Sequence, residues 1–136
     1  MAGILHAKNC FGCSLNNPIG LKVKFRTKDS LLVGEFDSSQ NHEGPPCIIH
    51  GGVIAAIIDE SFAAFAVQVL KMDIRTIREE ISFRNPARLG DKLYIETSLK
   101  EEKSRAIIVE TRIYKDDTVI AEGLGTLFKV KNKSYC

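Results

Sequence analysis

The chain has 136 residues, 44% of them apolar, which is long enough for one domain with a substantial hydrophobic core. The formal net charge is +2 and charged residues of both signs are intermixed, so the sequence lacks the clustered basic face that is typical of nucleic-acid-binding proteins. Residues 1–6 contain too few apolar side chains for a secretory signal peptide, and we expect a cytoplasmic protein.

We expect one domain over residues 1–136, in which residues 1–20 form a cysteine-bearing segment that leads into a sheet. The four cysteines are too few and too scattered for the disulfide framework of a small secreted protein, so reduced thiols are expected. Cys10 and Cys13 form a CxxC motif, and His6 precedes it by four residues. The motif is either a zinc half-site, completed by Cys136 or by a second subunit, or a turn that packs near the N-terminus. A single CxxC favours the turn, and we expect no metal site.

Two strands are predicted before the helix. Leu21, Val23 and Phe25 alternate with basic residues, which predicts a strand over residues 21–26 with one solvated face. Residues 28–30 turn the chain into a second strand over residues 31–36, which forms the hairpin partner. Residues 37–49 are polar and contain prolines, so they predict an irregular loop that leads to the helix.

The glycine pair Gly51-Gly52 opens the longest apolar run of the chain. Residues 53–70 contain neither proline nor glycine and are rich in alanine, isoleucine and phenylalanine, which predicts one buried helix that ends near residues 71–73. Its length of about 30 Å would also span a membrane. However, Asp59, Glu60 and Gln68 interrupt the run and polar alternating segments surround it, so we expect no membrane insertion.

Four more strands are predicted over residues 76–85, 93–99, 107–114 and 119–130, joined mainly by short turns. Gly123 and Gly125 lie on one face of the last strand, where a helix can approach closely. The fold class is therefore α+β, an antiparallel sheet with one helix on it. Because one helix cannot cover both faces of six strands, we expect a partner subunit, in a homodimer that pairs into a dimer of dimers.

Several local patterns resemble one known family. The motif His50-Gly51-Gly52 is followed by Asp59, nine residues after the histidine, and is preceded by Gly44-Pro45. Residues 84–91 combine a strand end, a proline and a Gly-Asp pair. With the Cys-Phe-x-Cys and Asn-Pro-Ile-Gly-Leu elements of the N-terminus, most of the chain resembles the hotdog-fold acyl-CoA thioesterases of the phenylacetate-pathway (PaaI-like) type. The resemblance implies a six-stranded antiparallel sheet wrapped around one long central helix, and two sites at a dimer interface.

The resemblance also implies roles for residues. Asp59 falls on the catalytic carboxylate, which acts as a general base or as a nucleophile, and Gly51 or Gly52 supplies the backbone N–H that polarises the thioester carbonyl. Thr76 falls on a hydroxyl that the opposite subunit contributes. The family often has an amide at the position of Gly44, so polar help from this loop must come from the neighbouring residues, and Cys47 replaces a common glycine. Those neighbouring candidates for substrate binding are Asn41, His42 and Glu43.

The residues alone, without the family resemblance, are consistent with thioester hydrolysis. The first N–H groups of a helix have no intrahelical partner and lie at the positive end of its dipole, and burial makes a helix carboxylate such as Asp59 a stronger base. Asp59 could instead bond across a subunit interface, and Glu60, turned by about 100°, is expected to be a bystander. We favour an orienting or capping role for His50 over that of a catalytic base. No metal or organic cofactor is required.

Two further residues are candidates for substrate contact, each with a plain alternative. Phe62 suits an apolar acyl pocket but also suits the core, and Arg84 suits the phosphates of CoA but also suits a solvated surface. The leading hypothesis is an acyl-CoA thioesterase for aryl-acetyl or medium-chain acyl groups. An enoyl-CoA hydratase or dehydratase, suggested by residues 42–45, and a non-catalytic acyl-CoA-binding protein are the alternatives.

Overall fold

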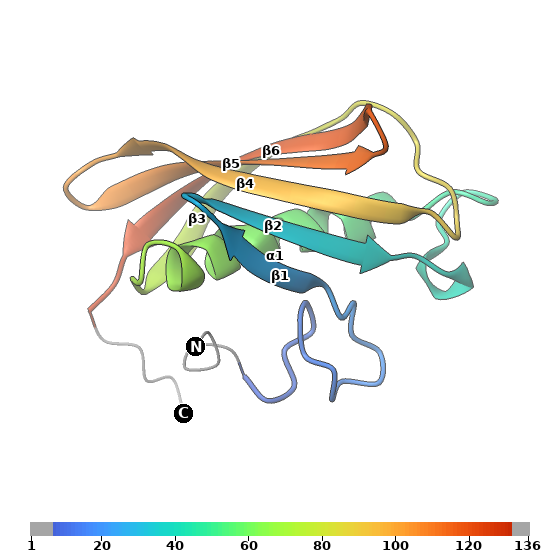
Figure 1. Ribbon diagram of the computed structural model, residues 1–136, viewed down its shortest axis with the longest axis horizontal. Coiled ribbons are helices and arrows are strands. Elements are labelled where there is room, and N and C mark those ends of the chain that lie inside the picture. The colour runs from blue at the N-terminus through green and yellow to red at the C-terminus, as the bar shows by residue number, and fades with distance from the viewer. Residues whose placement is uncertain (1–6, 132–136) are drawn as a thin grey trace.

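The computed structural model describes residues 7–131, so His6 and Cys136, both named for a zinc half-site, lie outside the described residues. One six-stranded antiparallel sheet curves around a single long helix (Figure 1). The strand order is β1-β2-β4-β5-β6-β3, which leaves β1 and β3 at the two edges. This arrangement confirms the predicted hotdog fold. The elements are β1 (Lys24–Lys28), β2 (Leu31–Asp37), the 3-10 helix η2 (Gln40–His42), α1 (Gly51–Gln68), β3 (Ile74–Phe83), β4 (Lys92–Glu102), β5 (Ala106–Lys115) and β6 (Thr118–Lys129).

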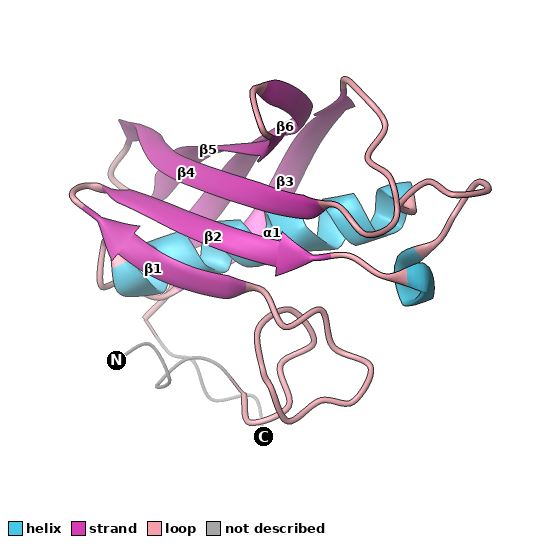
Figure 2. Cartoon of the chain, turned by 45° about the vertical axis from the view of Figure 1, so that its right-hand side comes forward, coloured by secondary structure: helices cyan, strands magenta, loops and turns pink. Residues whose placement is uncertain are grey.

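The helix α1 lies along the concave side of the sheet (Figure 2). Its length and hydropathy alone would allow it to cross a membrane, but the buried core helix of a soluble protein can have the same length and hydropathy. Here its large apolar side chains are buried in the core with those of the strands. It ends at Gln68, slightly before the predicted end, and Lys71 then adopts a left-handed backbone with φ of 56°. The fully buried large side chains of α1 are Ile57, Ile58, Phe62 and Phe65.

The helix and strand β6 approach each other closely at two glycines. A Cβ atom at Gly123 would lie 2.6 Å from Cγ2 of Ile58, and one at Gly125 would lie 2.6 Å from Cε2 of Phe62. Both distances are far below van der Waals contact, so only glycine allows these side chains to reach the sheet. The close approach predicted from the two glycines is confirmed.

Three buried hydroxyl groups also join the helix to the sheet. Ser61 Oγ donates to the carbonyl oxygen of Ile58 at 2.6 Å and lies 2.7 Å from Thr111 Oγ1, which lies 2.8 Å from Thr97 Oγ1. Because each hydroxyl has one proton, Thr111 donates to Ser61 and Thr97 donates to Thr111. The chain of donors satisfies polar groups that the apolar core would otherwise penalise.

The first strand is shorter than predicted. It begins at Lys24, because Lys22 adopts a left-handed φ of 57° that interrupts the extended backbone. Leu21 and Val23 are buried as expected, but their N–H groups donate to the carbonyl oxygens of Phe11 and Gly12 at 2.7 and 2.9 Å. Residues 21–23 therefore hold the N-terminal segment against the domain.

The edge strand β3 carries a bulge that decides which side chains face the helix. Thr76 pairs with Leu127 and Arg78 with Thr126, so Ile77 is an additional residue without a partner in the register. A bulge reverses the alternation of the residues that follow it. Before it Ile74 packs against the core, and after it Ile81 does, while Glu79 lies on the same face as Ile81.

Candidate active site

The start of α1 presents one backbone N–H group that the fold does not use. The N–H of Gly52 donates to Nδ1 of His50 at 2.7 Å, and those of Val53 and Ile54 donate to the His50 carbonyl at 3.0 and 3.3 Å. Within residues 7–131, no acceptor is recorded for the N–H of Gly51. His50 thus takes the predicted capping role, and of the two predicted donors Gly51 is the one available to a substrate carbonyl.

The loop before the helix is held by its own side chains. His42 Nδ1 accepts the N–H of Ser39 at 3.0 Å, and the His42 ring packs on Phe36 with a centroid distance of 4.9 Å. Burial lowers the pKa of His42, so its neutral form, which can accept this bond, is favoured. The loop can pass over the helix start because position 44 is glycine, where a Cβ atom would lie 2.8 Å from His50 Cα.

The loop therefore does not present its predicted substrate-binding residues equally. Glu43 Oε2 accepts the N–H of Cys47 at 2.8 Å, so this carboxylate closes a turn within the loop. Cys47 itself has a left-handed φ of 68°, a conformation that glycine adopts more readily than cysteine. Asn41 is exposed and, with His42, lines a surface hollow of about 740 Å³, and so it remains a candidate for substrate contact.

The predicted catalytic carboxylate has an acidic neighbour on the edge strand. Asp59 is exposed on α1, so the burial expected for this carboxylate is not found in the single chain. Its side chain is hydrogen-bonded to that of Glu79 on β3. Burial, then this hydrogen bond and then the Asp59 charge raise the pKa of Glu79 to about 8. At neutral pH Glu79 is therefore mainly a carboxylic acid that donates its proton to the Asp59 carboxylate.

Glu79 was missed in the sequence, although a signal for it was present. It stands two residues before Ile81 and four before Phe83, which is the spacing of one strand face. The bulge at Ile77 turns this face toward α1, and the Phe83 ring lies 3.6 Å from where a Cβ of Gly51 would be. The face of β3 after the bulge thus follows the helix from Asp59 to Gly51.

Thr76 lies on the other side of the bulge. It is half-buried, and no hydrogen bond between Thr76 and Asp59 is recorded among the described residues. Its predicted contact requires the second subunit, and it stays a prediction.

An apolar hollow of about 300 Å³ lies beside the helix start. Gly51 and Ile54 of α1 line one side, and Phe83 with the following Pro86 lines another. A group bound here would lie next to the Gly51 N–H. The remaining lining residues are Pro45, Ile48, Ile49, Arg84, Asn85, Ala87 and Ile120.

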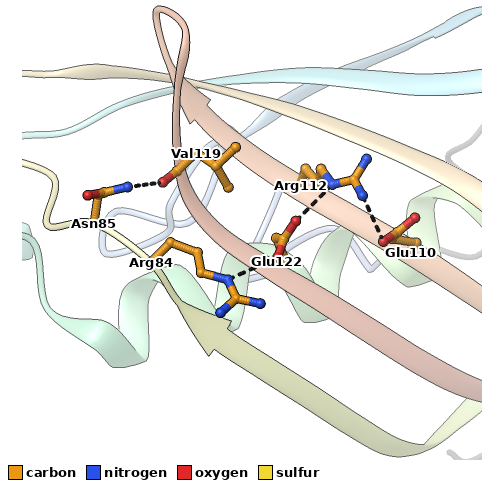
Figure 3. Close-up of polar contacts among 6 residues, drawn as sticks. All are labelled: Arg84, Asn85, Glu110, Arg112, Val119 and Glu122. Carbon is orange, nitrogen blue, oxygen red and sulfur yellow. Dashed lines mark hydrogen bonds and ion pairs between the residues drawn. The ribbon is translucent and has the colours of Figure 1, made fainter.

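Arg84 lies at this hollow but is already paired. Its Nε is 3.0 Å from Glu122 Oε1, and the second Glu122 oxygen accepts from Arg112 Nε at 2.9 Å (Figure 3). Arg112 and then Arg84 lower the pKa of the Glu122 carboxyl, so it stays ionised and holds both cations. The Arg84 side chain is still 55% exposed, and its contact with CoA phosphates stays a prediction.

Phe62 lines neither the hollow beside Gly51 nor the hollow beside Asn41. Its side chain has no exposed surface and packs against Gly123 and Gly125 of β6. This burial contradicts its predicted role in substrate binding, because the residue forms part of the core.

The sequence matches a known protein family. Residues 48–122 match the family model of the Thioesterase superfamily. Acyl-coenzyme A thioesterase THEM4 from Xenopus laevis is 30% identical over 105 residues, which cover 76% of this chain and 47% of that protein. The chain thus spans about half the length of this curated relative.

Solved structures show the same fold. The PaaI protein of the E. coli phenylacetic acid degradation operon has a TM-score of 0.75 at 16% identity, over 82% of this chain and 82% of that chain. A hypothetical thioesterase from Streptococcus pneumoniae TIGR4, solved with coenzyme A, has a TM-score of 0.75 at 16% identity, over 82% of this chain and 91% of that one. Given the family match over more than half of its length, the chain belongs to the thioesterase superfamily.

Proposed function

We propose that the protein hydrolyses acyl-CoA thioesters whose acyl group is aryl-acetyl or medium-chain. The observation that carries the proposal is the available N–H of Gly51 at the start of a helix that also bears Asp59. The name of the Xenopus relative and the coenzyme A in the pneumococcal structure support a CoA ester. The apolar hollow beside Gly51 supports an apolar acyl group.

The residues suit the two needs of thioester hydrolysis. The Gly51 N–H donates to the carbonyl oxygen, which becomes an oxyanion as the carbonyl carbon is attacked. Asp59 either takes a proton from the attacking water or attacks the carbon itself to form an anhydride that water then cleaves. In both cases the C–S bond breaks, and the CoA thiolate leaves and takes up a proton. Glu79, as the protonated partner, fixes the orientation of the Asp59 carboxylate.

We propose that the working site needs two subunits. Gly51 and Asp59 are eight residues apart, which is about 12 Å along the helix axis. The donor lies about 3 Å from the carbonyl oxygen, and the nucleophile lies about 3 Å from the carbonyl carbon. Gly51 and Asp59 of one helix are too far apart to act on the same carbonyl group. Twofold pairing would place Gly51 of one chain near Asp59 of its partner, with Thr76 contributed across the interface.

The free edge of β3 supports this homodimer. The strand has ten residues and, among residues 7–131, pairs only with β6, and Ile77 and Phe83 on it are 50% and 58% exposed. Long edge strands with exposed apolar side chains are normally covered or paired. Antiparallel pairing of β3 with its copy would extend the sheet across two subunits.

A panel of acyl-CoA esters separates this function from its alternatives. We expect release of free thiol, fastest with phenylacetyl-CoA or a medium-chain acyl-CoA. Enoyl-CoA hydration without thiol release would favour a hydratase. Against this alternative, Nδ1 of His42 already accepts a hydrogen bond from Ser39, and its ring packs on Phe36. CoA esters that stay bound and intact for hours would instead indicate a binding protein.

Two substitutions test the assigned atoms. Asp59→Asn keeps the shape of the side chain and should lower kcat by at least about 100-fold while the oligomeric state persists. Gly51→Pro removes one N–H at the first helical position, where proline is tolerated, and should lower kcat by about 100-fold relative to Gly51→Ala. Equal rates for Gly51→Pro and Gly51→Ala would refute the role of this N–H. Asp116→Asn, in the hairpin turn between β5 and β6 with φ of 51°, is the matched acid-to-amide control, because Asp116 has no part in the proposed site.

A further inference from the structure

The CxxC motif lies against the second acid of α1. The ligand atoms of Cys10, Cys13 and Glu60 all lie within 4.8 Å of one another, and Cys10 Sγ donates to Glu60 Oε1 at 3.4 Å. The two cysteines and the glutamate are about fifty positions apart in the sequence, and all three residues are half-buried. The fold therefore assembles two thiols and a carboxylate from separate segments.

The backbone of the turn is built for this approach. A Cβ atom at Gly12 would overlap the Glu60 carboxylate, so only glycine lets the turn close over it. The turn is held by Ser14 N–H to the Cys10 carbonyl at 3.1 Å and by the bonds that Phe11 and Gly12 accept from residues 21 and 23. These contacts set the spacing of the two sulfur atoms and the carboxylate independently of any ligand.

The environment of the carboxylate favours a cation. Glu60 Oε2 is shut away from solvent, beside two groups that become negative when they ionise. A metal that binds the two thiols displaces their protons to solvent. A divalent cation would compensate all three charges at once.

The donor set identifies the metal class. Two thiolates from a CxxC turn and one carboxylate are ligands that suit zinc, whose tetrahedral geometry separates neighbouring donors by about 3.6 Å. The three ligand atoms lie within 4.8 Å of one another, so they would have to move closer together by about 1 Å at most to reach this separation. The fourth position is left for water or for a further ligand.

We propose that Cys10, Cys13 and Glu60 form a zinc site that clamps the N-terminal turn to helix α1. The site is structural, because none of its three ligands takes part in the hydrolysis proposed for Gly51 and Asp59. It gives Glu60, expected to be a bystander, a role of its own.

Cobalt binding tests the site directly. Reduced, metal-free protein is titrated with Co²⁺, and thiolate-to-cobalt charge-transfer absorption is followed, after which Zn²⁺ is added in competition. We expect one Co²⁺ per chain, displaced by Zn²⁺, and a higher Tm with Zn²⁺ than without. The readout does not involve turnover, so it is independent of the proposed thioesterase activity.

Variants assign the ligands. Cys13→Ser should abolish the charge-transfer band or weaken binding at least tenfold, and Glu60→Gln, which keeps the side-chain shape, should weaken binding about tenfold or more. Cys47→Ser is the matched control, because this exposed cysteine lies in another loop, and it should bind as the parent does. A parent protein that gives no band when fully reduced, or a band that persists unchanged in Cys13→Ser, would overturn the proposal. Circular dichroism confirms that each variant is folded.

Discussion

Glu79 should make the folded chain lose stability as the pH rises, and Glu79→Gln should remove that loss. In the folded chain the pKa of Glu79 is raised from 4.5 to about 8, chiefly by burial and next by its hydrogen bond to Asp59. In the unfolded chain the carboxyl returns to its ordinary pKa. Between these two values the folded state binds more protons than the unfolded state, so the free energy of unfolding falls with rising pH.

The size of the effect follows from the two pKa values. At pH 7 the interval from 4.5 corresponds to roughly 3 kcal/mol, and solvent screening at this half-buried position reduces it to about 1 kcal/mol. Glutamine keeps a donor for Asp59 but does not ionise. Glu79→Gln should therefore match the parent at about pH 4.5 and exceed its stability by about 1 kcal/mol near pH 8.

Urea unfolding followed by circular dichroism at about pH 5 and about pH 8 measures this difference. The matched control is Glu80→Gln on the same strand, where the carboxylate is 61% exposed and pairs with Arg78 at 3.0 Å. Because this variant keeps Glu79, its free energy of unfolding should fall between the two pH values as much as that of the parent. If the parent and Glu79→Gln instead show parallel changes with pH, the raised pKa of Glu79 is refuted.

Two further predictions concern the backbone. Cys47→Gly should raise the free energy of unfolding by about 0.5–1 kcal/mol, because glycine removes the strain of a left-handed φ of 68°, and a rise in Tm by calorimetry checks it; an unchanged or lower Tm contradicts it. Gly125→Ala should destabilise by about 2 kcal/mol, because the new Cβ would lie 2.6 Å from the Phe62 ring, whereas Gly51→Ala, with its nearest contact at 3.6 Å, should cost less than half of that in the same urea titration.

The architecture was predictable because its signals are local. The apolar run after Gly51-Gly52 could only be a buried helix, and alternation with intervening turns marked each of the six strands. The close packing at Gly123 and Gly125 was also readable, since two small residues on one strand face indicate a close neighbour. The predicted start of β1 was wrong because the pattern of apolar residues does not reveal that Lys22 adopts a left-handed backbone.

The site was predictable only in part, because side-chain partners depend on the tertiary fold. Asp59, His50 and Gly51 were named from their order along one helix and from the family resemblance, and the catalytic roles of Asp59 and Gly51 stay predictions. Glu79 was missed because a bulge, which the alternation alone does not locate, sets its direction. Phe62 was assigned to substrate because a helix that is apolar on all sides does not reveal which side meets the sheet.

The consecutive acids of α1 have a consequence for the helix as a whole. Asp59 meets Glu79 on the edge strand, and Glu60 meets the cysteines of the N-terminal turn. Successive helical residues differ by about 100° in direction, so these two contacts fix the angle of the helix about its own axis. The close packing of Ile58 and Phe62 against β6 holds the same rotational setting from the sheet side. The two carboxylates add to this restraint from the edge strand and the N-terminal turn, and together these contacts decide which residues of α1 a substrate can meet.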